Sequence, residues 1–207
     1  MKNIYKNYIK RLFDLILSIL FLLLFFWLFL IISIIIYIDD PGNVIFCQKR
    51  IGINKSFFNL YKFRTMKMDT PKDTPTHLLK NPDMYITRFG HFLRKSSLDE
   101  LPQIINILKS DMAIVGPRPA LWNQDDLIFE RDKYKANDIL PGLTGWAQIN
   151  GRDELSIPVK AKYDGIYTEI LNSGGLKAML FDIKCIVLTF KNVITRKGIV
   201  EGEKQKI

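Results

Sequence analysis

The sequence predicts a helix-rich α+β fold in which a membrane helix precedes a small cytosolic domain with a β-hairpin and interfacial amphipathic helices. Three observations lead to this prediction: an uncharged apolar run over residues 15–38, a β-rich stretch over 44–66, and helical periodicity through much of the remainder. The 207 residues leave room for one membrane segment and one domain of ordinary size. We therefore expect residues 1–40 to form a membrane-embedded helix, 41–200 the cytosolic domain, and 201–207 a polar tail.

The apolar run Leu15–Ile38 contains no charged residue and only two serines. Its 24 residues would make about 36 Å of helix, enough to cross a hydrocarbon core of about 30 Å. Basic residues flank the run on both sides, namely Lys2, Lys6, Lys10 and Arg11 before it and Lys49, Arg50 and Lys55 after it. Because this balance gives a spanning helix no preferred orientation, we favour a re-entrant helix that bends and returns to the same membrane face. A straight spanning helix is the alternative.

Residues 44–66 predict a β-hairpin, because two short β-rich runs surround a turn at Gly52-Ile53-Asn54-Lys55. In the second run, Tyr61-Lys62-Phe63-Arg64 alternates rings with cations, which places both cations on one face of the strand. That face is either solvated or turned toward an anionic ligand. Residues 68–85 carry several prolines and no periodicity, and predict a loop.

Two later segments predict amphipathic helices. The first, residues 123–138, places apolar side chains and one arginine at helical spacing: Leu127, Ile128, Arg131 and Tyr134. The second, residues 176–197, combines an apolar stripe with lysines that recur every seven residues: Lys177, Lys184 and Lys191. This last helix either packs in the core with a solvated back or lies in the lipid headgroup region.

Asp99 and Glu100 are adjacent carboxylates between a basic pair, Arg94-Lys95, and an apolar run that predicts a helix. Ser97 and Glu100 have the spacing of a capping box, which would place both acids in the first turn of a helix. Pro102 indicates either a kinked turn or a helix that begins there. Because helix N-termini favour negative charge, we expect Asp99 to stay ionised and to be available as a nucleophile or metal ligand. The alternative is a simple cap with a solvated aspartate.

Other charged side chains are candidates for ligand binding around this stretch: Arg88, Arg94, Arg118, Arg152 and Asp164. Arg118 carries the clearest signal, because it lies in Gly116-Pro117-Arg118-Pro119 between two residues of fixed φ. Such a rigid segment is a poor place for an arginine that only increases solubility. A cation held there suits the recognition of an anionic group.

The charge balance also indicates an acidic partner, since 30 Lys and Arg residues against 21 Asp and Glu give a net charge of +9. Nucleic acid is the weakest choice, because the basic residues are spread along the chain without a recognition-helix, zinc-finger or RNP pattern. Lipid and nucleotide phosphates explain the charge better. Cys47 and Cys185 lack metal-ligand spacing and predict free cytosolic thiols. A bound metal would therefore take oxygen ligands, which suits Mg²⁺.

Five motifs follow one another along the chain: Lys10-Arg11-Leu12-Phe13-Asp14, Tyr61-Lys62-Phe63-Arg64-Thr65-Met66, Ser97-Leu98-Asp99-Glu100-Leu101-Pro102-Gln103, Val115-Gly116-Pro117-Arg118-Pro119 and Pro141-Gly142-Leu143-Thr144-Gly145-Trp146-Ala147-Gln148. Together they resemble the bacterial sugar transferase family, whose members are monotopic phosphoglycosyl transferases that work with polyprenyl phosphate. The resemblance covers nearly the whole chain. One departure is Phe26-Trp27, where the family has a Ser-Pro pair that breaks the membrane helix.

The resemblance implies an enzyme that transfers a phosphosugar from a UDP-sugar to undecaprenyl phosphate and releases UMP. It implies that Asp99 forms a phosphosugar–aspartyl intermediate and that Glu100 helps to bind Mg²⁺. It also implies that Arg88, Arg118 and Lys62 bind substrate phosphate. The expected location is the bacterial inner membrane, with the catalytic domain on the cytoplasmic face and downstream glycosyltransferases as possible partners.

A rival function is that of a non-catalytic, membrane-anchored adaptor that binds anionic lipid or a glycosyltransferase. The presence of Asp99, Glu100 and Arg118 in one chain argues against it. A phosphoglycosyl transferase with several membrane spans is excluded by the single apolar run. No residue pattern indicates which sugar is carried, and residues 68–85 are the segment that we expect to select it.

Overall fold

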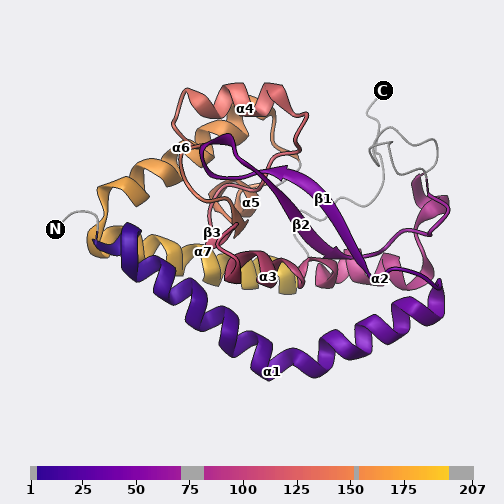
Figure 1. Ribbon diagram of the computed structural model, residues 1–207. Helices are drawn as coiled ribbons and strands as arrows, with labels where there is room; N and C mark the ends of the chain where they lie inside the picture. Colours follow the sequence, from indigo (N-terminus) through magenta and orange to yellow (C-terminus); the bar gives the residue numbers. More distant parts are fainter. Residues whose placement is uncertain (1–3, 71–81, 152–153, 196–207) are drawn as a thin grey trace.

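The computed structural model describes residues 4–70, 82–151 and 154–195. In these residues one long helix runs along a small domain of helices and short strands (Figure 1). The chain passes from the long helix into a β-hairpin and then through helices and two further short strands. The predicted helix-rich α+β class is confirmed.

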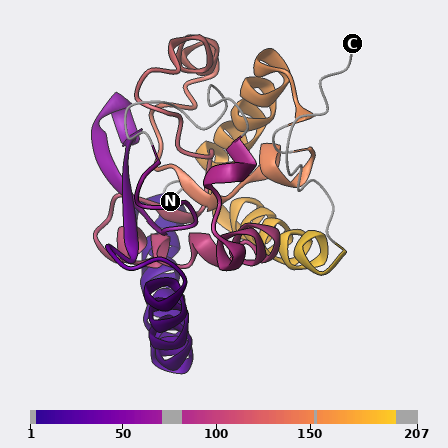
Figure 2. The same cartoon turned by 90° about the vertical axis from the view of Figure 1, so that its right-hand side faces the viewer.

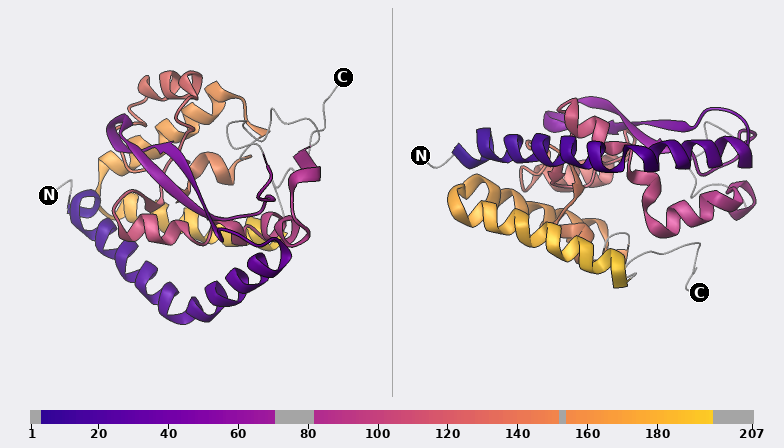
Figure 3. Two further views of the ribbon diagram at one scale, coloured as in Figure 1. Left: turned by 45° about the vertical axis from the view of Figure 1, so that its right-hand side comes forward. Right: turned by 90° about the horizontal axis from the view of Figure 1, so that it is seen from below.

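The apolar run forms α1 (Lys10–Asp39), which continues from a π-helical turn at Tyr5–Ile9. In the described residues this is the one segment long and apolar enough to cross a membrane. Figure 1 shows that α1 bends in its middle and that both ends approach the domain, whereas Figure 3 shows it running straight when seen from below. Leu23, Leu24 and Trp27 in the middle are 74%, 66% and 54% exposed. These apolar side chains therefore lie outside the protein's own core.

The predicted hairpin is confirmed. β1 (Ile45–Ile51) pairs antiparallel with β2 (Phe57–Phe63), and Ile51 lies opposite Phe57. The turn lies where the Gly52–Lys55 sequence predicts it, and Asn54 adopts a left-handed φ of 51° that asparagine tolerates better than most residues.

Three short elements follow closely: α2 (Arg88–Ser96), a 3₁₀ turn at Leu98–Glu100, and α3 (Gln103–Leu108). β3 (Ala113–Val115) then pairs in parallel with β4 (Gly142–Thr144). Parallel strands require a crossover between them, and the intervening segment contains a helix. The two short strands lie inside the domain, with most of their residues buried.

Four helices complete the domain: α4 (Asp125–Asp132), α5 (Trp146–Ile149), α6 (Ile157–Ser173) and α7 (Gly175–Thr195). α4 is shorter than the helix predicted for residues 123–138. Gly174, which follows α6, and Gly175, the first residue of α7, both have positive φ, which ends one helix and allows the next to begin in a new direction.

The N-terminal end of α1 is fixed to the domain by polar contacts. Lys10 Nζ lies 2.9 Å from Asp182 Oδ2 on α7, and the Tyr5 hydroxyl donates to the same oxygen at 2.7 Å. Asp14 Oδ1 accepts a 3.1 Å hydrogen bond from the backbone N–H of Ile114 in β3. Lys10 and Asp14 are buried, and these partners offset part of the cost of their desolvation.

The C-terminal end of α1 is fixed to the same domain. Arg64, which follows β2, places its Nη1 2.6 Å from Asp40 Oδ2. The neighbouring Asp39 accepts a 3.1 Å hydrogen bond from the backbone N–H of Phe89 in the first turn of α2. Both ends of the apolar helix therefore rest on one domain, and Figure 2 shows α1 protruding from one side of it.

α7 turns its small and polar side chains toward the domain. Ala178 and Cys185 are buried and pack in one cluster with Tyr167 and Leu171 of α6. Large apolar side chains of α7 are exposed instead: Leu176, Leu180, Ile183, Val187 and Phe190. Of the two predictions for this helix, the core-packed apolar stripe is therefore wrong, and Figure 3 shows α7 beside α1 when the molecule is seen from below.

Both cysteines are free, as the sequence predicts. Cys185 is buried within α7, and its thiol pKa is raised to about 12 because burial disfavours the thiolate. Cys47 is exposed on β1.

Candidate functional site

Asp99 and Glu100 lie in the turn between α2 and α3. Ser97 ends α2 in a left-handed conformation with φ of 57°, and the 3₁₀ turn that carries the acids begins immediately after it. Its side chain makes no capping hydrogen bond to this turn. The predicted capping box is therefore wrong, because Ser97 closes the preceding helix instead of opening the next one.

The helix after the acids begins at Gln103, with Pro102 at its N-cap position. This agrees with the prediction that the helix starts at the proline. The acids thus occupy a tight turn before α3, where no α-helical first turn surrounds them. The side-chain cap in this region belongs to Thr87, whose hydroxyl accepts a 2.9 Å hydrogen bond from the Gly90 N–H in α2.

Two cations hold Glu100. Lys62 Nζ on β2 lies 3.0 Å from Glu100 Oε1, and Arg118 Nη2 lies 2.7 Å from the same oxygen. Lys62 also lies 3.5 Å from Asp99 Oδ2, so one ammonium bridges the two carboxylates. Each acid is only 9% exposed. The hairpin and the loop that carries Arg118 therefore meet at the acid pair.

The pKa of Asp99 is raised above its ordinary value. The largest cause is burial, which disfavours the charged form, and the neighbouring Glu100 carboxylate adds to it. Lys62, Arg94 and Arg118 act in the opposite direction. The expectation that a helix N-terminus favours the ionised form of Asp99 is thus wrong in its cause and direction. Once ionised, this carboxylate is more basic than an ordinary aspartate and therefore a stronger nucleophile.

Arg118 is carried on a segment with little freedom. The Gly116 N–H donates to Thr144 O at 2.8 Å, and Pro117 O accepts from the Gly142 N–H at 2.8 Å. A Cβ on Gly116 would lie 2.5 Å from the backbone oxygen of Leu140, so only glycine fits there. These contacts extend the β3–β4 pairing up to the residue before Arg118.

The other two predicted arginines before the acids lie differently. Arg94 Nε donates to Thr65 Oγ1 at 2.8 Å, and the Arg94 charge lowers the pKa of Asp99, so Arg94 belongs to the site's surroundings. Arg88 is exposed at the first residue of α2, at the opposite end of that nine-residue helix from Asp99. At about 1.5 Å per residue, the two ends of α2 lie about 12 Å apart.

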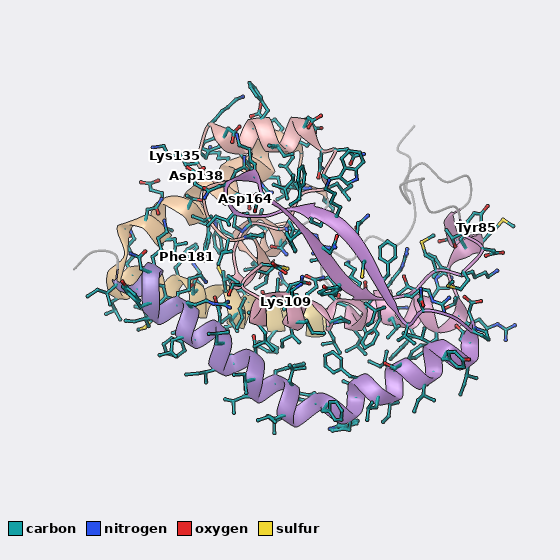
Figure 4. The ribbon with its side chains drawn as sticks, in the orientation of Figure 1. Tyr85, Lys109, Lys135, Asp138, Asp164 and Phe181 are labelled. Atoms are coloured by element: carbon teal, nitrogen blue, oxygen red, sulfur yellow. The ribbon has the colours of Figure 1, made fainter. Side chains whose placement is uncertain are left out.

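Asp164 is not part of the acid site. Its Oδ2 accepts hydrogen bonds from Arg131 Nη2 at 2.6 Å and Arg131 Nε at 2.8 Å, which joins α6 to α4. Figure 4 labels Asp164 beside these helices, away from α1. Asp164 therefore lies in a buried ion pair between α4 and α6. Arg152, the remaining candidate, lies outside the described residues.

The acid pair suits a hard cation in its donor chemistry. Mg²⁺ prefers oxygen ligands and often uses only one or two carboxylates, with substrate phosphates and water completing its shell. Asp99 and Glu100 offer two such carboxylates side by side. In the described ranges, no group of three or more His, Cys, Asp and Glu side chains gathers to form a complete metal site. The residues therefore fit Mg²⁺ that arrives with a phosphate-bearing substrate.

Two contacts made by arginines near the site could not be predicted from the sequence. Lys62 contacts the acid pair, but Arg64 does not: β2 ends at Phe63, and Arg64 pairs with Asp40 instead. Arg50, counted only as a flanking positive charge, donates from Nη1 to Pro119 O at 2.9 Å. Neither contact has a local sequence signal, since each joins residues more than twenty positions apart.

Paired buried carboxylates that share cations, and an apolar helix fixed at both ends, are the features of a membrane-associated protein. The family model for bacterial sugar transferases matches residues 5–196. The chain belongs to this family.

Several relatives share the same span. EpsL of Bacillus subtilis (strain 168), an uncharacterized sugar transferase, is 36% identical over 191 residues, which cover 92% of this chain and 90% of EpsL. The undecaprenyl-phosphate glucose phosphotransferase of Komagataeibacter xylinus is 38% identical over 193 residues, 89% of this chain and 36% of that protein. The UDP-glucose:undecaprenyl-phosphate glucose-1-phosphate transferase of Escherichia coli (strain K12) is 35% identical over 196 residues, 91% of this chain and 41% of that protein. The chain thus spans less than half of these two glucose transferases.

Proposed function

We propose that the protein transfers a phosphosugar from a UDP-sugar to undecaprenyl phosphate through a covalent intermediate on Asp99, releasing UMP. The observation that carries this proposal is the acid pair itself, two buried carboxylates held by Lys62 and Arg118. A buried, more basic aspartate beside cations is suited to attack phosphorus. The names of the relatives from K. xylinus and E. coli support the same lipid acceptor.

The chemistry proceeds in two displacements. An oxygen of Asp99 attacks the phosphorus that carries the sugar, and the bond from that phosphorus to the bridging oxygen breaks. UMP leaves with the bridging oxygen and its electron pair. A phosphate oxygen of undecaprenyl phosphate then attacks the same phosphorus and releases the Asp99 carboxylate. Using one carboxylate twice lets a soluble and a membrane-bound substrate react at the same site.

The surrounding cations take the charge that develops on phosphate oxygens. Arg118 is 26% exposed in its side chain, so its guanidinium can bind substrate phosphate while it contacts Glu100. Lys62 is suited to keep Asp99 ionised until it attacks. Arg94 adds positive charge nearby. Arg88 stays a candidate for binding substrate phosphate, and Arg152 stays a further candidate.

Glu100, together with Asp99, would hold Mg²⁺. The ion would neutralise the diphosphate and the departing UMP. Glu100 also anchors Lys62 and Arg118, so its replacement disturbs two functions. Glu100→Gln should lower turnover severely and raise the Mg²⁺ concentration needed for half-maximal rate. If the Glu100→Gln variant is slower but needs the same Mg²⁺ concentration, Glu100 does not bind the ion.

The direct test is a UMP-release assay with the purified full-length chain, undecaprenyl phosphate and Mg²⁺. The panel should include UDP-glucose, UDP-galactose and UDP-N-acetylgalactosamine, because the relatives are named for different sugars. Omitting the lipid should leave a single-turnover burst of UMP and a phosphosugar adduct on the peptide that contains Asp99. Absence of UMP release with every sugar would favour the adaptor function.

We further propose that α1 is re-entrant and that the domain lies on the cytoplasmic face of the inner membrane. The contacts at the two ends of α1 support this proposal. Lys10 and Asp14 near one end of α1, and Asp39 and Asp40 at the other, all contact the same domain, which can occupy only one side of a bilayer. A straight spanning helix would have to break one of these sets of contacts.

Thiol labelling tests this topology. Lys2→Cys in a background without Cys47 and Cys185 should resist a membrane-impermeant thiol reagent in intact cells and react after lysis. The same background with a cysteine at exposed Asn43 beyond α1 is the matched control and should behave identically. Labelling of Lys2→Cys from outside would show that α1 spans the membrane.

A further inference from the structure

We propose that Arg50, oriented by Gln48, is a positioning residue that holds Arg118 against the acid pair. This proposal rests on the proposed function for its catalytic consequence, while the contact that it describes stands on geometry. Arg50 Nη1 donates to the backbone oxygen of Pro119 at 2.9 Å. Pro119 directly follows Arg118, so the guanidinium of Arg50 fixes the backbone next to the arginine that contacts Glu100.

The segment around Arg118 is fixed on two sides. On one side, Gly116 and Pro117 are hydrogen-bonded to the backbone of β4. On the other side, the Ile51 N–H donates to Ala120 O at 3.0 Å, beside the bond from Arg50 to Pro119. Arg118 is the residue between these two sets of bonds. Its side chain can then reach Glu100 from only a narrow range of backbone positions.

The hairpin holds both cations that contact Glu100. In an antiparallel ribbon, alternate residues share a face, and residues directly opposite one another share it too. Gln48 lies opposite Leu60, and Arg50 lies opposite Phe58, so both lie on the same face as Lys62. This face therefore supplies Lys62 to Glu100 directly and holds the backbone of Arg118 through Arg50. Strand β1 therefore contributes to the site by holding the backbone beside Arg118.

Gln48 explains why an arginine is needed at position 50. Gln48 Oε1 accepts from Arg50 Nη2 at 2.6 Å and from Nε at 3.2 Å, which fixes the plane of the guanidinium. Nη1 then points to Pro119 O. A lysine keeps the charge but presents a single ammonium on a flexible stem, which cannot hold this fork of contacts. Arg50→Lys should therefore behave almost like Arg50→Ala.

The expected effect follows from how steeply catalysis depends on geometry. A displacement of about 1 Å in a substrate-positioning group can cost about 100-fold in rate. We expect Arg50→Ala to lower kcat/KM by about 10- to 100-fold, and Gln48→Leu by less, because the latter loosens the guanidinium without removing it. Lys49→Ala is the matched control. It removes the same charge from the neighbouring residue, whose side chain lies on the other face over the Phe57 ring.

The test is a double-mutant cycle in the full-length protein, with radiolabelled UDP-sugar so that slow variants remain measurable. If Arg50 acts through Arg118, then Arg50→Ala costs 10- to 100-fold in the parent chain but little in an Arg118→Ala background. Lys49→Ala should change neither background by more than about twofold. Equal losses in both backgrounds, or no loss in either, would overturn the proposal. If Arg50→Ala does not fold, Arg50→Lys and Gln48→Leu enter the same cycle.

A second measurement separates this proposal from the proposed function. Amide hydrogen exchange of residues 116–121, which exclude Trp122 beside Lys49, and of the Ile51 amide should be faster in Arg50→Ala than in Lys49→Ala and the parent chain. If the parent chain releases no UMP from any UDP-sugar, the proposed function fails, yet faster exchange still supports the clamp. Unchanged exchange in a folded Arg50→Ala protein would refute the clamp whatever the activity.

Discussion

Asp99 and Asp164 are both buried aspartates beside cationic side chains, and burial raises the pKa of both. Their surroundings nevertheless differ. Asp164 shares its Oδ2 with two nitrogens of one arginine, Arg131, at 2.6 and 2.8 Å, and the pair is 1% and 3% exposed. Asp99 meets Lys62 at 3.5 Å, and that lysine is shared with a second carboxylate.

This difference separates an acid that completes a fold from an acid that can react. Asp164 has one partner of matching geometry, and both side chains of this pair are buried. At the Asp99 site, two carboxylates share their cations, and the neighbouring Glu100 carboxylate adds to the burial that raises the pKa of Asp99. A metal ion that entered this site would relieve the repulsion between the two carboxylates. Mutations at the two aspartates should therefore have opposite effects on activity and stability.

The largest expected effect is on turnover in Asp99→Asn. An amide cannot form the phosphoester, so kcat should fall by about 10³-fold or more. The protein should fold normally and form no phosphosugar adduct. Measurement of UMP release and intact mass, with the melting temperature as control, checks this. Near-normal turnover would remove Asp99 from the nucleophile position.

Asp164→Ala should act in the opposite way. Removing one partner leaves Arg131 charged and buried, which typically costs about 3–5 kcal/mol of stability. Denaturation of the purified protein measures this loss, while activity per folded molecule should remain close to that of the parent. A paired apolar replacement, Arg131→Met with Asp164→Leu, should recover most of the stability. A folded Asp164→Ala protein without activity would contradict the structural assignment.

Arg118→Ala should have a smaller effect, limited to catalysis. Loss of a charge-assisted contact to substrate phosphate should cost about 2–4 kcal/mol of transition-state stabilisation. The melting temperature should barely change, because the side chain is partly exposed and lies outside the packed core. Steady-state kinetics and thermal denaturation of the same preparation decide between this role and a structural one. Loss of folded protein with full activity in the remainder would favour the latter.

The smallest expected effect concerns pH. The raised pKa of Asp99 means that its ionisation opposes folding, so its contribution to stability is present at acid pH and lost as the pH rises through the raised pKa. Asp99→Asn should therefore melt slightly higher than the parent at neutral pH, and the difference should shrink as the pH falls. Thermal melts between pH 7 and pH 4 measure it. A gap that widens toward acid pH would mean that the pKa of Asp99 is lowered instead.

Much of the fold follows from local patterns. The apolar run gives α1, the turn at Gly52–Lys55 gives the hairpin, and Pro102 marks the start of α3. These features succeed because each depends on residues that are neighbours in sequence. Ser97 shows the limit of such patterns. The spacing of a capping box is identical whether the serine opens the next helix or closes the last one, and only its left-handed φ distinguishes the two.

The sequence predicts the central residues of the site but not the long-range partners of the surrounding charged residues. Asp99, Glu100, Lys62 and Arg118 come together as the sequence motifs indicate. The partner of Asp164 could not be predicted, because Arg131 lies 33 residues away on another helix. α7 was ambiguous for a related reason. Its apolar stripe is clear in the sequence. Whether that stripe faces the core depends on which face of the helix packs on the domain, and here the face with Ala178 and Cys185 is buried.

The contacts at the two ends of α1 give the membrane segment a function inside the domain. Asp14 satisfies the backbone of β3, the strand that leads to Arg118, and Asp40 pairs with Arg64, which follows the strand that carries Lys62. A protein from which residues 1–40 were removed would leave the Ile114 N–H and the Arg64 guanidinium without these partners. Replacing α1 by an unrelated anchor would do the same. A water-soluble form of this enzyme therefore has to keep both ends of α1 and redesign only the exposed middle.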